Sequence, residues 1–393
     1  MHLDVARLRA DTPGCERVVH LNNAGSSLPP DVVVETVVTH LRREAEIGGY
    51  EAHAEAAERI DGVYDSVADL LGTQARNIAQ QESATAAWHR ALLSVPFEAG
   101  DRVLVATSEY ASNVLPLLQL VGRLGVTVEF VPDGADGALD PAALRSMLDE
   151  RVRLVAVTHA PSQNGLVNDA AGVGRVLRDT GSDAWYLLDA CQSVGQLPVD
   201  VSGIGCDFLS ATGRKFLRGP RGTGFLYASD RALALEPYPL DLHSATWTGD
   251  ASYAVADTAR RYELWERSYA GLLGLGAAVD YARALGVDRL RDRIRSLTER
   301  ARAGLAEVPG VVVRDRGSER GGIVTLTHDR VAAADIVGAL RSLGINTSLS
   351  TPEYALQDFT TQQVDALVRV SPHAYNTEAE IDRLVAAVAD VTR

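Results

Sequence analysis

The sequence predicts an α/β protein with two unequal domains. We expect a large domain with a mostly parallel mixed sheet flanked by helices, and a smaller α+β domain at the C-terminal end. Three observations favour this fold. The chain has 393 residues, enough for two or three domains. Short apolar segments alternate with helical ones between about residues 70 and 230, and the pattern changes after about Trp265.

The first part of the pattern consists of buried strands and crossover helices. Four short segments rich in branched apolar residues are predicted as strands, at residues 102–107, 126–131, 153–158 and 184–189. Residues 141–149 and 170–180 are predicted as helices that cross between strands. Strands joined in this way run parallel, and helices cover both faces of their sheet. Such sheets bind ligands beyond the carboxyl ends of their strands.

The second part begins with two long helices, predicted at residues 271–284 and 288–308. A second, smaller sheet is predicted from strands at residues 311–313, 322–326 and 367–370. An amphipathic helix at residues 378–391 closes the chain. We therefore expect three parts: an N-terminal segment that packs on the small domain, a large domain and a small domain, at residues 1–20, 21–265 and 266–393.

The charge and the cysteine content narrow the class of function. Asp and Glu outnumber Lys and Arg by 52 to 38, which gives a net charge of −14. Nucleic acids and membrane surfaces attract positive potential, so neither is an expected partner. The three cysteines have no zinc-site spacing, and we expect no metal. We find neither a secretory signal nor a run of about 18 apolar residues, and therefore expect a cytoplasmic enzyme.

Asp189, at the end of an apolar segment, is the first candidate for chemistry. A carboxylate there can face the crevice beyond the strands and bond a protonated pyridine nitrogen. The ring then stays cationic and can accept electrons. An Asp that only caps the following turn fits the same position.

Residues 210–215 (Ser-Ala-Thr-Gly-Arg-Lys) follow a short apolar segment and supply the second candidate. A buried Lys215 amine can form a Schiff base with an aldehyde and later move a proton. The hydroxyl of Thr212 and the guanidinium of Arg214 suit a phosphate dianion. A basic surface loop over residues 214–221 would explain the same residues.

Ser83, Ala84 and Thr85 precede a helical run at residues 86–95 and form the third candidate. Small and hydroxyl-bearing residues at a helix N-terminus can bind phosphate through amides, hydroxyls and the helix dipole. An ordinary N-cap explains them equally well. Each motif is ambiguous alone, and their order along the chain is what makes them specific.

In that order the motifs resemble the class V aminotransferases, a family of fold type I pyridoxal 5′-phosphate (PLP) enzymes that includes the cysteine desulfurases. The resemblance runs nearly from end to end. It begins at residues 21–25 (Leu-Asn-Asn-Ala-Gly) and continues through residues 189–192 (Asp-Ala-Cys-Gln), 210–215 and 261–263 (Arg-Tyr-Glu). It ends at Arg369 and residues 375–378 (Tyr-Asn-Thr-Glu).

The resemblance implies two catalytic residues, Lys215 as the carrier of the cofactor and Asp189 as the partner of its pyridine nitrogen. Gln192 and Asn164 match residues near the cofactor's phenolic oxygen. Tyr110 matches the place of a ring stacked on the cofactor, although the family commonly has His there. A packed loop aromatic is the alternative for Tyr110.

The resemblance also implies how the anionic groups are held. Four residues match phosphate-binding positions, although the family often has His where the last of them stands: Ala84, Thr85, Thr212 and Arg214. Arg369 and Asn164 match residues near the carboxylate of a small amino-acid substrate. Arginine's planar fork suits a bidentate contact of this kind. The alternative for Arg369 is an ion pair on an edge strand.

Members of the family are usually homodimers with active sites near the subunit interface, and the resemblance implies a homodimer here. Thr248 and Gly249 lie in a stretch, residues 247–250, that we expect to be a loop. They are expected to reach the phosphate bound by the partner subunit.

The reaction type depends on a loop that carries a sulfur-accepting Cys in cysteine desulfurases. The corresponding residues here, 344–351, contain no Cys. Residues 22–29, 48–51, 111–113 and 189–227 are similar instead to the ergothioneine-pathway branch, with its hercynylcysteine sulfoxide C–S lyase, and to lincosamide-pathway enzymes that process cysteine S-conjugates.

The resemblance therefore implies a PLP-dependent C–S β-lyase. Such an enzyme cleaves a cysteine S-conjugate or its sulfoxide to a thiol or sulfenate, pyruvate and ammonia. Oxidative decarboxylation-deamination of a cysteine S-conjugate, transamination and epimerisation are the alternatives. The intact set of Lys215, Asp189 and Arg369 argues against a scaffold without activity.

Overall fold

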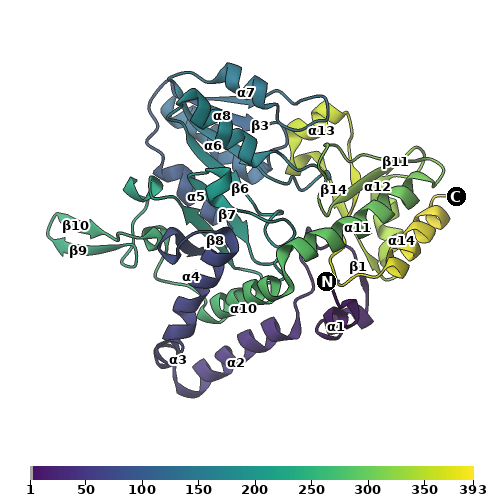
Figure 1. Ribbon diagram of the computed structural model, residues 1–393, viewed down its shortest axis with the longest axis horizontal. Coiled ribbons are helices and arrows are strands. Elements are labelled where there is room, and N and C mark those ends of the chain that lie inside the picture. Colours follow the sequence, from purple (N-terminus) through teal and green to yellow (C-terminus); the bar gives the residue numbers. More distant parts are fainter. Residues whose placement is uncertain (1–2) are drawn as a thin grey trace.

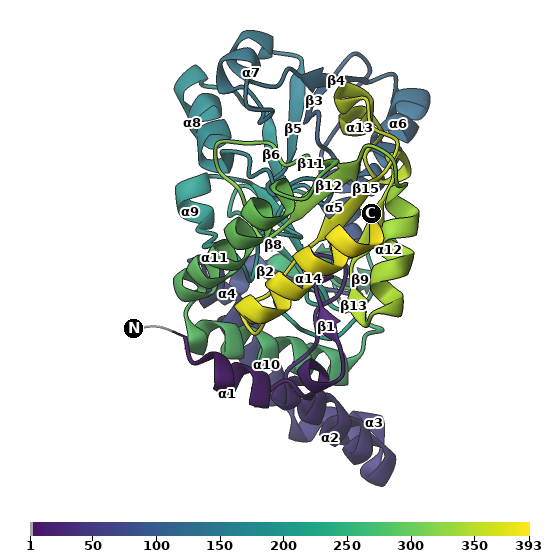
Figure 2. The same ribbon diagram turned by 90° about the vertical axis from the view of Figure 1, so that its right-hand side faces the viewer.

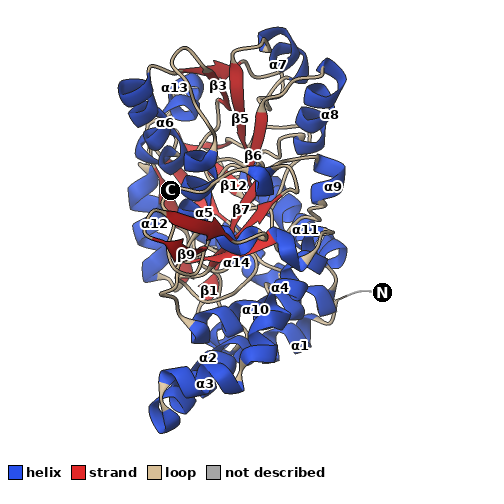
Figure 3. Cartoon of the chain, turned by 90° about the vertical axis from the view of Figure 1, so that its left-hand side faces the viewer, coloured by secondary structure: helices blue, strands red, loops and turns tan. Residues whose placement is uncertain are grey.

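The computed structural model describes residues 3–393, and its centre is a seven-stranded sheet with helices on both faces (Figures 1 and 3). β8 runs antiparallel to both of its neighbours, and every other pair in this sheet is parallel. The predicted mostly parallel mixed sheet is confirmed. In spatial order the strands are β2 (Ile78–Gln81), β8 (Gly224–Ala228), β7 (Phe208–Thr212), β6 (Trp185–Asp189), β5 (Val152–Thr158), β3 (Arg102–Ala106) and β4 (Thr127–Val131).

Successive side chains of a strand point to opposite faces of the sheet, and here helices cover both faces, so the side chains on each face are buried. Val103 and Val105 of β3 belong to a hydrophobic cluster with Trp88, while Leu104 between them belongs to a different cluster. The helices that follow the strands supply much of the cover: α5 (Ala84–Ser94), α6 (Ala111–Leu124), α7 (Pro141–Met147), α8 (Ala170–Thr180) and α9 (Val201–Ile204).

A layer of helices from distant parts of the chain closes the lower end of the molecule in Figure 1. Helix α10 packs on α2 and α4. A Cβ atom at Gly276 would lie 2.6 Å from Val63 Cγ2, and one at Gly274 would lie 2.5 Å from Val37 Cγ2. Glycine at both positions therefore allows the helices to approach closely. The helices are α2 (Asp31–Ile47), α3 (Gly49–Glu55), α4 (Ala57–Leu71) and α10 (Tyr269–Leu285).

The C-terminal part forms a separate four-stranded antiparallel sheet covered by helices (Figure 2). Leu297, Ile336 and Leu384 belong to its hydrophobic core. In spatial order its strands are β11 (Val311–Val313), β12 (Val324–His328), β15 (Leu367–Val370) and β14 (Ser348–Ser350). The helices of this part are α11 (Val287–Ala306), α12 (Ala333–Ser342), α13 (Leu356–Gln362) and α14 (Glu378–Val391).

The N-terminal segment, which includes α1 (Val5–Ala10), lies against this C-terminal part. Strand β1 (Val19–His20) pairs in parallel with β13 (Ile345–Asn346), and Arg9 Nη1 lies 2.9 Å from Glu380 Oε1. Met1 and His2 of the predicted segment lie outside the described residues. Helix α10 falls in the predicted small domain, residues 266–393, but it packs on α2 and α4 of the first part. The domain boundary at residue 265 therefore stays a prediction.

Residues 247–250 are not a loop as predicted. They lie in a hairpin of β9 (Ala245–Gly249) and β10 (Ser252–Val255) that projects from the body (Figure 1). Most of its residues are exposed on both faces, so the sequence lacks the alternation that marks a half-buried strand.

Short 3₁₀ helices complete the chain: η1 (Pro13–Glu16), η2 (Ala75–Asn77), η3 (Ala232–Ala234), η4 (Ala259–Tyr262) and η5 (Pro352–Tyr354). Within residues 3–393 no individual helix has the length and apolar character of a membrane span. The pair α10 and α11 meets those criteria only when taken together across its 80° bend.

Candidate active site

Two adjoining cavities open beyond the carboxyl ends of β3, β5, β6 and β7, where parallel sheets bind ligands. Their volumes are about 320 Å³ and about 170 Å³. Five residues line both cavities, which we therefore treat as one site, the Lys215 pocket: Tyr110, Ser162, Gln192, Arg214 and Lys215.

The amine and the carboxylate expected to be catalytic enter the larger cavity from neighbouring strands. Asp189 is the last residue of β6, and Lys215 follows the end of β7 by three residues. The pairing of Asp189 with Ser210 places the two strand ends side by side. Within the described part of the chain, Lys215 forms no ion pair within 4.0 Å.

Two hydrogen bonds fix the carboxylate of the buried Asp189. The backbone N–H of Cys191 donates to Oδ1 at 2.8 Å, and Nδ2 of Asn113 donates to Oδ2 at 2.9 Å. Each oxygen keeps a further lone pair, so the carboxylate can still accept a hydrogen bond from a ligand. This is the acceptor that a protonated pyridine nitrogen requires.

The N-terminus of α5 supplies hydrogen-bond donors to the larger cavity. Ser83 is the N-cap, and its Oγ accepts from the N–H of Ala86 at 3.1 Å. The capping interpretation of Ser83 is therefore correct, and it is compatible with anion binding. The amides of Ala84 and Thr85 precede the first intrahelical bond, so the helix leaves them available.

Side chains opposite α5 add further donors. Arg214 and Arg221 line the same cavity, as does Thr212, whose hydroxyl donates to Thr223 O at 3.2 Å. A Cβ atom at Gly224 would lie 2.6 Å from Ala211 O and 2.9 Å from the carbonyl carbon of Ser83, so only glycine allows β8 to approach both β7 and α5 this closely. That close approach places the donors of β7 and α5 around one small volume.

Arg369 lies on β15 and lines the smaller cavity. Its Nη1 donates to Ser162 O at 2.9 Å and its Nη2 to Asn22 Oδ1 at 3.2 Å, but its buried Nε has no partner. Burial lowers the pKa of the guanidinium to about 10. No carboxylate among residues 3–393 forms an ion pair with it, and β15 lies between β12 and β14, so the alternative of an edge-strand ion pair does not apply.

Tyr110 is the N-cap residue of α6 and lines both cavities. Its ring is nearly parallel to that of Tyr354, at 9° and with 6.3 Å between the centroids. Burial raises the pKa of the Tyr110 phenol, and the nearby Tyr354 acts in the same direction. Together the two rings form an aromatic wall beside the smaller cavity.

Cys191 and Gln192 form part of the wall of the larger cavity. Burial raises the pKa of the Cys191 thiol, although Lys215 opposes the effect. The thiol is therefore protonated near neutral pH. Gln192 donates from Nε2 to Ala24 O at 3.0 Å, while its buried Oε1 has no partner and can accept a hydrogen bond from a ligand.

Three residues expected at the site do not line either cavity. Asn164 is buried, its Nδ2 donates to Asp358 and its Oδ1 accepts from Leu166 N, each at 3.0 Å. Its polar atoms are thus engaged elsewhere. Thr248 and Gly249 lie in the exposed β9–β10 hairpin and are absent from the lining of the pocket.

Several residues at the site had no individual role predicted from the sequence. Asn113 and Thr158 line the larger cavity, and Glu109 lies behind them. Thr158 ends a buried strand, and Glu109 and Asn113 follow one. Their place at the carboxyl ends of parallel strands could have identified them as candidate site residues. Ser348 and Ser350 in β14 line the smaller cavity and come from a distant part of the chain.

These features fit PLP, which carries an aldehyde, a phosphate dianion and a basic pyridine nitrogen. Lys215 offers an amine to the aldehyde, and Asp189 a carboxylate to the nitrogen. The amides of Ala84 and Thr85, with Arg214, offer an anion cradle. Gln192 Oε1 and Arg369 Nε are buried without a partner, so both can bond polar atoms of such a ligand.

Comparison with known proteins identifies relatives over nearly the whole chain. Residues 19–384 match the model of the family described as Aminotransferase class-V. A probable cysteine desulfurase of Methanothermobacter thermautotrophicus is 30% identical over 384 residues, which cover 96% of this chain and 95% of that protein.

Solved structures of similar proteins share the fold. An apo cysteine desulfurase from Thermococcus onnurineus NA1 has a TM-score of 0.92 at 24% identity and covers 100% of this chain and 98% of its own. A cystine C–S lyase in complex with its product, cysteine persulfide, has a TM-score of 0.87 at 24% identity, covering 96% and 99%. The predicted PLP fold type I is confirmed.

Proposed function

The chain belongs to the class V aminotransferase family of PLP enzymes, and we propose that it is a C–S β-lyase acting on a cysteine S-conjugate or its sulfoxide. At the coarser level it is a PLP-dependent enzyme of the cysteine desulfurase and C–S lyase type. The proposed products are pyruvate, ammonia and a thiol or sulfenate.

The observation that carries this proposal is the composition of the smaller cavity. Ser348, Leu349 and Ser350 lie there beside Lys215 and Arg369, and no cysteine lines that cavity within the described chain. Sulfur transfer to the enzyme requires a thiol that reaches the substrate's sulfur atom. Without one at this place, the sulfur fragment leaves as a free product.

Cys191 is a poor substitute for such an acceptor. It lies in the wall of the larger cavity next to Asp189, and burial keeps its thiol protonated near neutral pH. A thiol attacks sulfur only as the thiolate. The other two cysteines, Cys15 and Cys206, are buried and line neither cavity.

Arg369 is proposed to bind the α-carboxylate of the substrate. A buried guanidinium without an acidic partner attracts an anion, and Nε is available for one of its hydrogen bonds. The aromatic wall of Tyr110 and Tyr354 beside the same cavity suits a flat or apolar substituent on the substrate's sulfur. Recognition of a small amino acid and of its S-substituent then occurs in one cavity.

PLP held in this pocket would supply an electron sink for the electron pair left on the substrate's α-carbon when its proton is removed. The Lys215 amine would take the proton from that carbon as general base. Asp189 keeps a proton on the pyridine nitrogen. The C–S bond would break with its electron pair going to sulfur, and hydrolysis of the remaining three-carbon fragment would give pyruvate and ammonia.

Product analysis by mass spectrometry tests the proposal. PLP-loaded protein is incubated with cysteine, with several cysteine S-conjugates and with their sulfoxides, including hercynylcysteine sulfoxide and a lincosamide-type conjugate. Pyruvate with a released thiol or sulfenate-derived product is expected, and Lys215→Ala is the control for uncatalysed cleavage. The preferred conjugate identifies the S-substituent.

Other products would contradict the β-lyase. An aldehyde that keeps its sulfur, with loss of carbon dioxide, would indicate oxidative decarboxylation-deamination. Alanine with an enzyme-bound persulfide would indicate a desulfurase. Pyridoxamine phosphate left on the protein would indicate a transaminase, and an inverted α-carbon an epimerase.

The protein is also proposed to act as a homodimer in the cytoplasm. Thr248 and Gly249 do not line their own pocket, and the neighbouring Trp247 is 81% exposed. A partner subunit would cover this ring and receive the hairpin at its phosphate cradle. All three cysteines are free, as in proteins of a reducing compartment. Sedimentation equilibrium tests the assembly, and a monomer at micromolar concentration would refute it.

A further inference from the structure

Glu109 is a buried carboxylate that lies behind the Lys215 pocket without lining it. It follows β3 and precedes α6. The N–H of Thr158 donates to Oε1, and the Thr158 hydroxyl donates to Oε2 at 2.8 Å. Glu109 therefore joins the end of β3 to the end of β5, the neighbouring strand.

The same carboxylate also reaches Asp189 through one amide. Nδ2 of Asn113 donates to Glu109 Oε2 at 3.1 Å and to Asp189 Oδ2 at 2.9 Å. Both hydrogens of that NH₂ group are thus used, one for each carboxylate. Because Thr158 pairs in register with Asp189, the network spans the ends of three adjacent strands.

The two carboxylates, Glu109 and Asp189, together decide which way the Asn113 amide points. An ionised carboxylate only accepts hydrogen bonds, so Asn113 presents its NH₂ group to Glu109 and, from the same atom, to Asp189. A glutamine at position 109 would present an NH₂ group of its own. At least one of the three donors of Asn113 and Thr158 would then face another donor, so the arrangement that fixes the Asn113 amide beside Asp189 is weakened.

We propose that Glu109 is a positioning residue for the cofactor: it orients the Asn113 amide, which in turn holds Asp189 at the place of the pyridine nitrogen. The inference rests on the proposed role of Asp189 and adds a residue that does not touch the ligand. Glu109 acts only through Asn113 and Thr158.

The charges around Glu109 agree with this role. Burial and the negative charge of Asp189 raise the pKa of Glu109 to about 7, whereas the bonds from Asn113 and Thr158 lower it. Neither carboxylate forms an ion pair within the described residues. A ligand cation at Asp189 supplies the missing positive charge and favours the ionised form of Glu109.

The test compares Glu109→Gln with Glu129→Gln, the same chemical change at a half-buried surface ion pair with Arg102. Two readouts are independent of turnover: the dissociation constant of PLP, and the pH midpoint of the visible band of the cofactor bound at Lys215. In Glu109→Gln we expect roughly tenfold weaker PLP binding. We also expect a midpoint about one pH unit higher, because a less protonated pyridine nitrogen withdraws fewer electrons. Glu129→Gln should match the unmodified protein.

Asn113→Ala serves as the second variant, because it cuts the link and leaves Glu109 in place. It should show the same two changes, and the double variant should show no more than the larger single effect. The network is refuted if the visible band of Asn113→Ala has the same pH midpoint as that of the unmodified protein. The role of Glu109 is refuted if Asn113→Ala raises the pH midpoint of the visible band and weakens PLP binding but Glu109→Gln does neither. Protein that binds no PLP at all would instead overturn the proposed function.

Discussion

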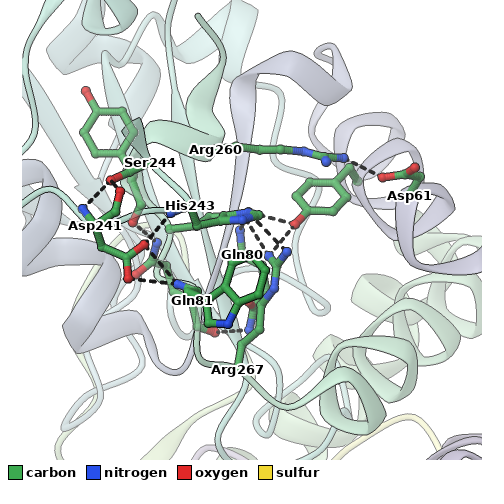
Figure 4. Close-up of polar contacts among 12 residues, drawn as sticks. Asp61, Gln80, Gln81, Asp241, His243, Ser244, Arg260 and Arg267 are labelled. Atoms are coloured by element: carbon green, nitrogen blue, oxygen red, sulfur yellow. Dashed lines mark hydrogen bonds and ion pairs between the residues drawn. The ribbon is translucent and has the colours of Figure 1, made fainter. Parts of the chain in front are cut away.

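The Glu263 cluster and the Lys215 pocket both bury charged side chains, but they balance these charges differently. The Glu263 cluster consists of Tyr64, His243, Glu263 and Arg267 (Figure 4). The Glu263 carboxylate is fully buried and accepts from Tyr64 Oη at 2.8 Å and from Gln80 N at 2.7 Å. It also lies 2.9 Å from His243 Nε2 and 2.5 Å from Arg267 Nη1.

In the Lys215 pocket the cations have no such partner. Arg214, Lys215 and Arg369 form no ion pair with any carboxylate in residues 3–393, and Arg369 keeps an unpaired Nε. A buried charge costs free energy unless an opposite charge and hydrogen bonds compensate it. The Glu263 cluster pairs its charges within the chain and so stabilises the fold. The cations of the Lys215 pocket lack carboxylate partners in the described chain and are suited to bind the anionic groups of a ligand.

The sharpest test of this difference removes the amine of the pocket. Lys215→Ala should lower turnover of the best conjugate by about 10⁴-fold or more, because both the cofactor link and the general base are lost. The variant should fold, since Lys215 forms no ion pair. Turnover is measured as pyruvate release, and thermal unfolding is the control. Turnover near the unmodified rate would refute the assignment of Lys215.

Removing the carboxylate-binding cation should have the next largest effect. Arg369→Gln is expected to lower kcat/KM by about 10²- to 10³-fold, mainly through KM, because a bidentate charged contact is lost. Arg369→Lys should recover only part of this, since an ammonium lacks the planar fork. Steady-state kinetics of both variants provide the measurement. A loss confined to PLP affinity, with KM unchanged, would place Arg369 in the cofactor site instead.

The elements around these two regions differ in how far the sequence predicts them. Helix α8 and strand β11 have the predicted bounds because their periodicity and apolar content are local signals. The β9–β10 hairpin has no buried face in this chain, so it lacks that signal. The predicted helix at residues 86–95 begins at Ala84 because the Ser83 cap sets its start.

The site shows the same limit. Lys215 and Asp189 enter one cavity, as their places after strands predict. The hydrogen bonds of Arg369 go to Ser162 and Asn22, which are 207 and 347 residues away in the chain. Asn164 follows the expected motif, yet its side chain binds Asp358 of α13. Contacts across such separations arise from tertiary packing, which local sequence patterns do not encode.

Breaking the balance of the Glu263 cluster should reduce stability and leave the cofactor site unchanged. Glu263→Gln is expected to cost about 3 kcal/mol of unfolding free energy, because Arg267 and its neighbours lose their buried anion. The matched surface change is Asp61→Asn, which removes an exposed pair with Arg260 at 2.7 Å (Figure 4) and should cost less than about 1 kcal/mol. Denaturant unfolding measures both. A large shift of the cofactor's visible band in Glu263→Gln would mean that the cluster belongs to the site.

The smallest effect is expected where paired charges remain exposed. Glu378 begins α14 and pairs with Arg293, and its side chain is 52% exposed. The bond from Arg293 lowers the pKa of Glu378 from 4.5 to about 2. Since the folded-state pKa is the lower one, the stabilisation is fully present above about pH 4.5 and is lost as pH falls toward 2.

Glu378→Gln tests that expectation by measuring the thermal midpoint at several pH values. Solvent screening limits the contribution to less than about 1 kcal/mol. The difference in midpoint between the unmodified protein and the variant should be small at pH 7 and should narrow as pH falls from about 4.5 toward 2. A difference that is independent of pH would mean that the glutamate acts through packing rather than charge. A small difference that does narrow would show that solvent exposure is why pairing matters less at Glu378 than in the Glu263 cluster.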